Sequence, residues 1–248
     1  FRERKSIEEA KKEFEEDYKY ESFIQYYFYK QWKKLKDYAN NKGIKIIGDL
    51  PIYVASNSAD TWQHPKLFCF DKHLKIKAVA GCPPDYFSKK GQLWGNVLYN
   101  WEAMKKDNYS WWEQRIKHSF LLYDVLRLDH FRGFASYWAI RYGEKTAING
   151  RWEIGPRIQF FRDLERKVKN IDIIAEDLGT LTADVFKLLR QTNYPNMKVL
   201  QFGLTEWDNM YNPKNYTENS VAYTGTHDNM PMMEWYSTLN KNEKFICD

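Results

Sequence analysis

Three carboxylates end short apolar runs, and two of them form a candidate catalytic pair. Asp129, Glu176 and Asp228 each follow a run rich in Val, Ile, Leu or Ala. Paired carboxylates are typical of glycoside chemistry, in which one acts as the nucleophile and the other as general acid and then base. Arg127 would keep Asp129 ionised, whereas the apolar residues before Glu176 favour its protonated form. The pattern therefore predicts Asp129 as the nucleophile and Glu176 as the acid/base.

A structural interpretation of these acids stays open at this point. A carboxylate after an apolar run is also typical of a helix cap or of a first-turn acid that complements the helix dipole. Asp177 could have such a role.

Aromatic and amide residues alternate between residues 82 and 101, in the segments CPPDYF (82–87), GQLWGN (91–96) and YNW (99–101). Rings stack on the apolar faces of sugars and amides bind sugar hydroxyls, so this composition suits a sugar site. Single-stranded nucleic acid would also stack on rings, but these lack a surrounding cluster of Lys and Arg. We therefore expect a sugar rather than a nucleic acid.

Five apolar, β-branched runs predict buried strands, at residues 44–50, 125–131, 171–177, 197–202 and 220–228. Amphipathic stretches suited to helices lie between them, at 101–122, 155–169 and 181–191. Strands that alternate with helices indicate βαβ units around a parallel sheet. The predicted fold class is α/β.

The ionisable residues gather at the ends of these runs, where Asp49 joins the three acids named above. A (β/α)₈ TIM barrel builds its active site at the carboxyl ends of its strands, and an open doubly wound sheet places ligands there too. No GxGxxG or Walker-type loop follows any run, which disfavours nucleotide binding. Five strand candidates rather than eight predict an incomplete barrel.

Two further segments complete the organisation. Residues 6–42 carry aromatic residues at a helical period, and Gly43 supplies a helix stop. Residues 53–100 are expected to form a long, loop-like insertion after the first strand. Loops of this length are usually functional. We expect one partial barrel over residues 1–248, with 53–100 as the substrate-loop region and no second independent domain.

Composition excludes several classes. Of the 248 residues, 43% are hydrophobic and 17% aromatic, which a disordered chain would not show, and no apolar run approaches the roughly 20 residues of a membrane span. The net charge of +5 comes from 38 basic and 33 acidic residues of mixed distribution, so we expect neither a nucleic-acid nor a membrane partner. Three cysteines without ligand spacing predict no zinc site and a reducing, cytoplasmic location.

Five motifs together resemble one enzyme family: GDLPIYV (48–54) with SAD (58–60), PPDYFS (83–88) with GQLWGN (91–96), RLDHFRGF (127–134), AEDLG (175–179) and GTHDN (225–229). Their order and residues are similar to those of the 4-α-glucanotransferases, also called amylomaltases or disproportionating enzymes, over residues 25–229. This family is related to the α-amylases. The resemblance implies a (β/α)₈ barrel that transfers a segment of an α-1,4-glucan to glucose or a maltooligosaccharide with retention of configuration.

The resemblance also implies individual roles. Asp129 matches the family's nucleophile, Glu176 its general acid/base, and Asp228 the carboxylate that stabilises the transition state. Arg127 matches the arginine that orients the nucleophile, and His227 a histidine that contacts sugar hydroxyls.

Three more residues are expected to bind substrate. Gln92 and Trp94 match a flexible loop over the cleft, and Asp49 has a binding or structural position at a strand end. The resemblance implies neither a metal ion nor an organic cofactor.

The five strands correspond by resemblance to the third through seventh of the barrel. The chain is therefore expected to be a piece of a longer transferase. A hydrolase of the α-amylase type and an inactive fragment that only binds glucan are the alternatives.

Overall fold

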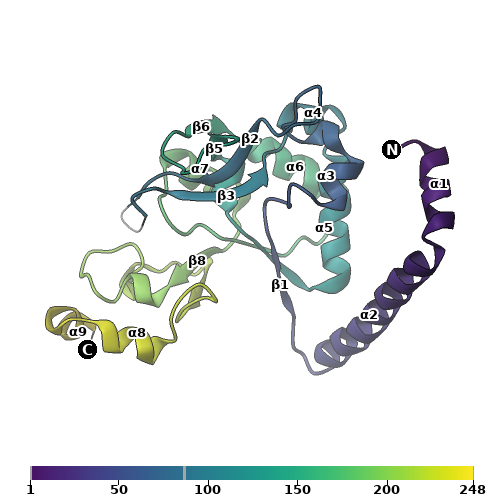
Figure 1. The fold of residues 1–248 in the computed structure, drawn as a ribbon. Coiled ribbons are helices and arrows are strands. Elements are labelled where there is room, and N and C mark those ends of the chain that lie inside the picture. Colours follow the sequence, from purple (N-terminus) through teal and green to yellow (C-terminus); the bar gives the residue numbers. More distant parts are fainter. Residues whose placement is uncertain (1, 86–87, 248) are drawn as a thin grey trace.

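The computed structural model describes residues 2–85 and 88–247. It contains a five-stranded parallel sheet (Figure 1). Its strands are β1 (Ile47–Leu50), β4 (Val125–Leu128), β7 (Ile173–Ala175), β8 (Asn196–Val199) and β9 (Ser220–Tyr223), hydrogen-bonded in the order β1-β4-β7-β8-β9. Every neighbouring pair is parallel. The α/β class, the parallel sheet and the five strand predictions are confirmed.

The register of β4 and β7 brings two of the predicted acids to one edge of the sheet. Leu128 pairs with Ala175, so Asp129 and Glu176 are the next residues on adjacent strands. All residues of both strands are buried, which is why their sequences are almost continuously apolar. The strand ends thus hold the two carboxylates side by side.

Four helices and an aromatic core cover this sheet. They are α4 (Trp101–Lys106), α5 (Ser110–Leu122), α6 (Arg157–Lys167) and α7 (Ala183–Thr192). The predicted helix at 101–122 is divided because Asn108 and Tyr109 adopt left-handed backbone conformations. The core between helices and sheet contains Leu126, Leu128, Trp112, Phe131, Phe134, Phe160 and Phe161. Four short 3₁₀ helices, η1 (Pro65–Leu67), η2 (Phe131–Phe134), η3 (Leu200–Phe202) and η4 (Pro213–Asn215), lie in the connections.

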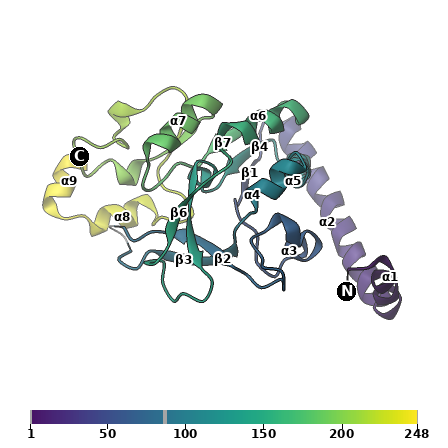
Figure 2. The same ribbon diagram turned by 90° about the horizontal axis from the view of Figure 1, so that it is seen from above.

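A second, antiparallel sheet was not predicted from the sequence. Its strands are β2 (Ala78–Cys82), β3 (Gln92–Val97), β5 (Ser136–Arg141) and β6 (Arg151–Ile154), in the order β3-β2-β5-β6. Together with α3 (Ala59–Gln63), β2 and β3 give regular structure to the segment 53–100, which was expected to be loop-like. Figure 2 shows this sheet beside the parallel one. The aromatic segment 82–101 therefore lies largely in and beside strands of this second sheet.

The amino-terminal helices α1 (Arg4–Glu13) and α2 (Glu15–Asn41) occupy the segment predicted as helical and extend away from both sheets (Figure 1). Neither contains a buried residue. Gly43 has a φ of +75° and its N–H donates to Asn40 O, so it ends α2 as expected. The chain closes with α8 (Met232–Thr238) and α9 (Lys241–Cys247). No helix among the described residues combines the length and the apolarity that crossing a bilayer requires.

Candidate functional site

A cleft of about 560 Å³ lies over the carboxyl ends of β4 and β7. One wall comes from β2, β3 and β6 of the second sheet and the other from the turn after β9. Six of the predicted site residues line it: Gln92, Trp94, Arg127, Asp129, Glu176 and Asp228. Tyr86 and Phe87 of the predicted PPDYFS motif lie outside the described residues.

Arg127 holds two carboxylates at the floor of the cleft. Its Nη1 lies 2.6 Å from Asp49 Oδ1 and 2.9 Å from Asp129 Oδ1. The guanidinium is buried on β4, and burial disfavours its charge, but the ion pairs raise its pKa above the ordinary value. Arg127 therefore stays a cation. Asp49 does not line the cleft, and its contact is with Arg127 at the base of the site.

The pKa of Asp129 is raised rather than lowered. Burial is the largest cause, the charges of Asp49 and Asp228 act in the same direction, and Arg127 opposes them. The contact between Arg127 and Asp129 was correctly predicted from the sequence. The predicted effect of Arg127, which favours the ionised form of Asp129, is present, but burial and the neighbouring carboxylates outweigh it in the direction of the pKa.

Glu176 is buried, with 8% of its surface exposed. Its Oε2 accepts the N–H of His130 at 2.7 Å, and its Oε1 accepts the N–H of Leu178 at 2.6 Å. Burial raises the pKa of Glu176 to about 7; the charge of Asp129 adds to this, and the two N–H donors oppose it. The predicted direction is confirmed. A carboxyl that titrates near neutral pH can both give and take a proton there.

The turn after β9 presents Asp228 to the cleft. Asn229 Oδ1 accepts from the N–H and the hydroxyl of Thr226, each at 2.9 Å, which fixes this turn. His227 Nε2 lies 3.6 Å from Asp228 Oδ1, and both side chains are exposed. Among the described residues His227 does not line the cleft, whereas Asp228, Thr226 and Asn229 do.

The wall opposite Glu176 is formed by β3. Trp94 Nε1 donates to Gln92 Oε1 at 3.0 Å, so the two predicted substrate-binding side chains are coupled to each other. The Trp94 ring meets the His130 ring edge to face, with centroids 4.8 Å apart. An indole and an amide on one wall suit the apolar face and the hydroxyls of a sugar.

Residues 1–248 match the 4-alpha-glucanotransferase family, glycoside hydrolase family 77. The chain belongs to this family. It is 50% identical over 245 residues to the 4-alpha-glucanotransferase of Clostridium butyricum, which covers 98% of this chain and 50% of that protein. The chloroplastic/amyloplastic 4-alpha-glucanotransferase of Solanum tuberosum is 48% identical over 221 residues, or 89% of this chain and 38% of that one.

A solved structure shows the same arrangement of chain. The amylomaltase from Streptococcus agalactiae in complex with acarbose superposes with a TM-score of 0.95 and 42% identity over 99% of this chain and 50% of that one. This chain therefore spans about half the length of the relatives it matches. The sequence resemblance to the 4-alpha-glucanotransferases is confirmed.

The cleft residues that were not predicted as site residues include three with polar or aromatic side chains beside the acids or at the end of the cleft: His130, Arg132 and Trp152. His130 and Arg132 stand within the quoted motif 127–134, so the motif itself was the available signal. Trp152 comes from β6, a strand that the sequence did not predict, and Arg132 lies 4.1 Å above its ring. Arg132 is buried and donates to Thr180 O, which packs the end of the cleft beyond Glu176.

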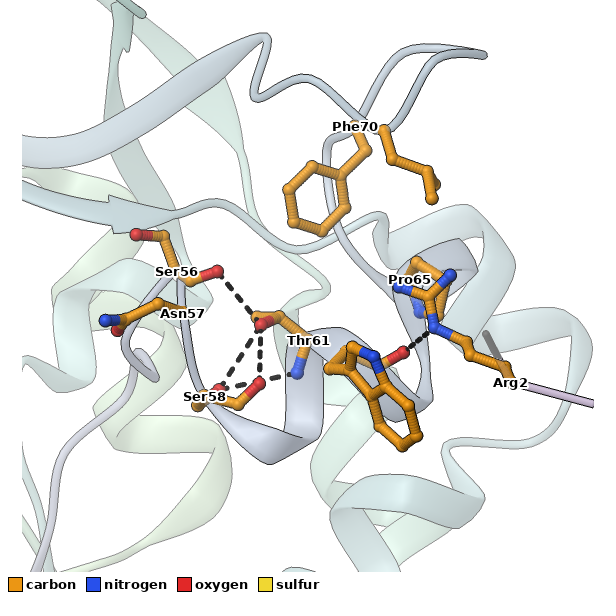
Figure 3. Close-up of a pocket in the computed structure, with 9 residues that line it drawn as sticks. Arg2, Ser56, Asn57, Ser58, Thr61, Pro65 and Phe70 are labelled. Atoms are coloured by element: carbon orange, nitrogen blue, oxygen red, sulfur yellow. Dashed lines mark hydrogen bonds between the residues drawn. The ribbon is translucent and has the colours of Figure 1, made fainter. Parts of the chain in front are cut away.

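A separate pocket lies beside α3, lined in part by Ser56 and Asn57 (Figure 3). The hydroxyl of Thr61 donates to Ser56 O at 3.0 Å and to Ser58 O at 2.9 Å, and the Thr61 N–H donates to Ser58 Oγ at 3.3 Å. These groups satisfy one another. The pocket contains none of the predicted site residues.

In the described ranges 2–85 and 88–247, no three His, Cys, Asp or Glu side chains come close enough to hold a metal ion. The acids of the cleft are partnered by Arg127 and by backbone N–H groups instead.

Proposed function

We propose that this chain carries the catalytic centre of a 4-α-glucanotransferase, which moves a segment of an α-1,4-glucan onto glucose or a maltooligosaccharide. The observation that carries the proposal is the placement of Asp129 and Glu176 on adjacent strand ends, one bound to an arginine and the other poised to titrate near neutral pH. Such a pair suits double displacement through a covalent glycosyl-enzyme.

In the first step a carboxylate oxygen of Asp129 attacks the anomeric carbon while Glu176 donates its proton to the glycosidic oxygen. The bond to the leaving sugar breaks, and the sugar departs with that proton. Arg127 holds one oxygen of Asp129 at 2.9 Å and thereby fixes the direction of the other. With a pKa of about 7, a substantial fraction of Glu176 is protonated at neutral pH, as the donor of a proton must be.

In the second step the roles of Glu176 reverse. Formation of the ester removes the negative charge of Asp129, which is one of the causes that raise the pKa of Glu176. The pKa of Glu176 therefore falls, so its carboxylate is ionised at neutral pH and can accept the proton of the acceptor hydroxyl as that oxygen attacks the anomeric carbon. The same side chain thus serves both steps without moving to another site.

The remaining predicted residues suit sugar binding. Asp228 and Gln92 offer acceptors for hydroxyl groups, Trp94 offers a ring, and His227 stands behind Asp228 at the rim. We propose Asp49 as a structural partner of Arg127 rather than a ligand of the sugar. No residue role in this proposal requires a cofactor.

We further propose that the parallel sheet is an arc of a (β/α)₈ barrel, with the segment 53–100 as its substrate-loop region. The parallel order and the gathering of acids at the strand ends support this. Cys69 and Cys82 are free thiols, in keeping with a reducing, cytoplasmic compartment.

One observation favours a second candidate, a chain that binds glucan without turnover. β1 and β9 are the two edges of the parallel sheet, and Ile47 on β1 is 51% exposed. An open edge of this kind loosens the strands that carry the acids.

The test is incubation of the chain with maltotriose, followed by chromatography of the products. Glucose together with maltooligosaccharides longer than maltotriose is expected for transfer. Glucose and maltose without longer products would instead indicate hydrolysis, and unchanged maltotriose with measurable glucan binding would favour the second candidate. The Asp129→Asn variant serves as the control for contaminating activity.

A further inference from the structure

The backbone of His130 is unusual for its residue type. Its φ of 51° and ψ of 48° are left-handed, a conformation that is unfavourable for a residue with a side chain. His130 stands between Asp129, at the end of β4, and the 3₁₀ helix η2. A strained backbone beside two acids invites the question of what it accomplishes there.

The left-handed turn directs two successive N–H groups at Glu176. The N–H of His130 donates to Glu176 Oε2 at 2.7 Å, and the N–H of Phe131 donates to the Glu176 backbone carbonyl at 2.9 Å. The N–H of Glu176 donates in turn to Leu128 O at 3.0 Å. Residues 128–131, at and after the end of β4, therefore form hydrogen bonds with both the main chain and the carboxyl group of Glu176.

Packing around His130 holds this conformation. The ring of Trp94 meets the imidazole at 4.8 Å, and the N–H of Gly133 donates to His130 O at 2.9 Å. A Cβ on Gly133 would lie 2.7 Å from Ile52 Cδ1 and 3.1 Å from His130 Cδ2, so a side chain at this position would displace Ile52 and press on the imidazole. The imidazole itself stays neutral, because burial and the charge of Arg132 lower its pKa to about 3.

We propose that His130 is a positioning residue whose left-handed backbone aims its N–H at Oε2 of Glu176 and so fixes the orientation and the protonation equilibrium of that carboxyl. The inference rests on the proposed role of Glu176 as acid/base. An N–H donor to a carboxylate stabilises the charged form, and burial stabilises the neutral form. The His130 N–H is thus one of two donors that keep the carboxyl able to ionise in its buried position.

Other charged groups also act on Glu176. The charge of Asp129 raises and that of Arg127 lowers the pKa of Glu176. The charge of Glu176 in turn raises the pKa values of Cys82 and Tyr211, which stay neutral. Asp129 is the direct neighbour of position 130, so an amide-to-ester replacement that removes the His130 N–H alone distinguishes the His130 contact from a displacement of Asp129.

The experiment is a ¹³C NMR titration of the chain labelled at the glutamate carboxyl carbons, with the Glu176 signal identified by its loss in Glu176→Gln. His130→Asn is the matched control, because asparagine tolerates the left-handed region and retains the N–H. His130→Val disfavours that region through its β-branched side chain. We expect a Glu176 pKa of about 7 in the wild type, the same value in His130→Asn, and a rise of about one unit in His130→Val.

Two outcomes would overturn the inference: a folded His130→Val variant with the wild-type Glu176 pKa, or a His130→Asn variant shifted as far as His130→Val. The second would mean that the imidazole, not the backbone, controls Glu176. Should His130→Val not fold, replacement of the amide between Asp129 and His130 by an ester, through an α-hydroxy acid, removes the N–H alone. The same rise is expected in the ester, and its absence would count against the inference.

The titration does not depend on turnover, so it separates this inference from the proposed function. Unchanged maltotriose together with the expected titration shifts would reject the proposed activity of the chain and support the positioning of Glu176 by His130. In an active chain, the basic limb of the kcat/KM profile is expected to move upward with the pKa of Glu176 in His130→Val.

Discussion

The end of β4 and the helix α2 differ as far as two parts of one chain can. All four residues of β4 are buried, whereas none of the 27 residues of α2 is. Around Asp129, Arg127 binds one oxygen of Asp49 and one of Asp129, and backbone N–H groups bind both oxygens of Glu176. Along α2, aromatic side chains such as Phe23 and Tyr27 contact each other with tilted rings while exposed to solvent.

What joins α2 to the rest of the chain is confined to its carboxyl-terminal half. Trp32 Nε1 donates to Leu122 O at 2.7 Å, and Lys36 Nζ lies 3.3 Å from Asp124 Oδ1. Exposed pairs such as Lys33 with Asp37 stabilise the helix by only about 0.3–0.5 kcal/mol each. The comparison teaches that the residues around the cleft build its geometry, whereas α2 is held to the rest of the chain through a few side chains: Tyr29, Trp32, Lys36 and Asn40.

The largest expected effect lies in the cleft. Asp129→Asn removes the proposed nucleophile, and we expect transfer from maltotriose to fall by about 10⁴-fold or more. Because the substitution also removes a partly buried charge beside Asp49 and Asp228, the thermal midpoint should not fall. Asp208→Asn, an exposed acid on a distant loop, is the matched control and should transfer as the wild type does. Near-normal transfer by Asp129→Asn would remove it from the mechanism.

Glu176→Gln should lower the transfer rate by about 10²–10⁴-fold, the usual contribution of general acid–base catalysis. A donor with a good aryl leaving group needs no protonation in the first step, so its cleavage should suffer less than that of maltotriose. Comparison of initial rates on the two donors measures the difference. Equal losses on both donors would argue against Glu176 as the acid.

The same variant should be more stable than the wild type at alkaline pH. The folded pKa of Glu176, about 7, lies above its ordinary value of 4.5, so its contribution to stability is present below pH 4.5 and is lost as the pH rises through 7. Glutamine never ionises. The free energy of unfolding of Glu176→Gln minus that of the wild type should therefore be roughly 2–3 kcal/mol larger at pH 8 than at pH 5.

Urea unfolding at both pH values measures this gain. Glu218→Gln, at an exposed position, is the control and should follow the wild type at both. A constant gap between Glu176→Gln and the wild type would show that Glu176 titrates at its ordinary pKa.

A smaller effect is expected where Trp32 joins α2 to the end of α5. Trp32→Phe removes the hydrogen bond to Leu122 O, worth about 1 kcal/mol, so the amides of α2 should exchange with solvent about fivefold faster. Amides of β4 and β7 should keep their protection. Phe23→Leu, at a position 57% exposed, should change neither. Faster exchange in β4 after Trp32→Phe would show that the two regions are coupled after all.

The sequence was sufficient for the parallel sheet because Val125, Ile173 and their neighbours form apolar runs of strand length. It was insufficient for the second sheet, since β2 consists mainly of small residues and the polar–apolar alternation of β6 lasts only four residues, so neither resembles the longer β-branched runs of the parallel sheet. The carboxylates of the cleft could be predicted because each stands at the end of a predicted strand. The left-handed backbone of His130 and the net direction of the Asp129 pKa did not, because each is a sum of tertiary contacts that no local pattern contains.

The arginine shared by two aspartates has a consequence for the lifetime of the proposed intermediate. Asp49, Arg127 and an ionised Asp129 together carry one negative charge, and they are partly withdrawn from water. Once Asp129 is an ester, the trio is electrically neutral. The three side chains at the floor of the cleft are therefore electrically neutral in the glycosyl-enzyme. This neutrality stabilises the intermediate and lengthens its lifetime until an acceptor sugar binds.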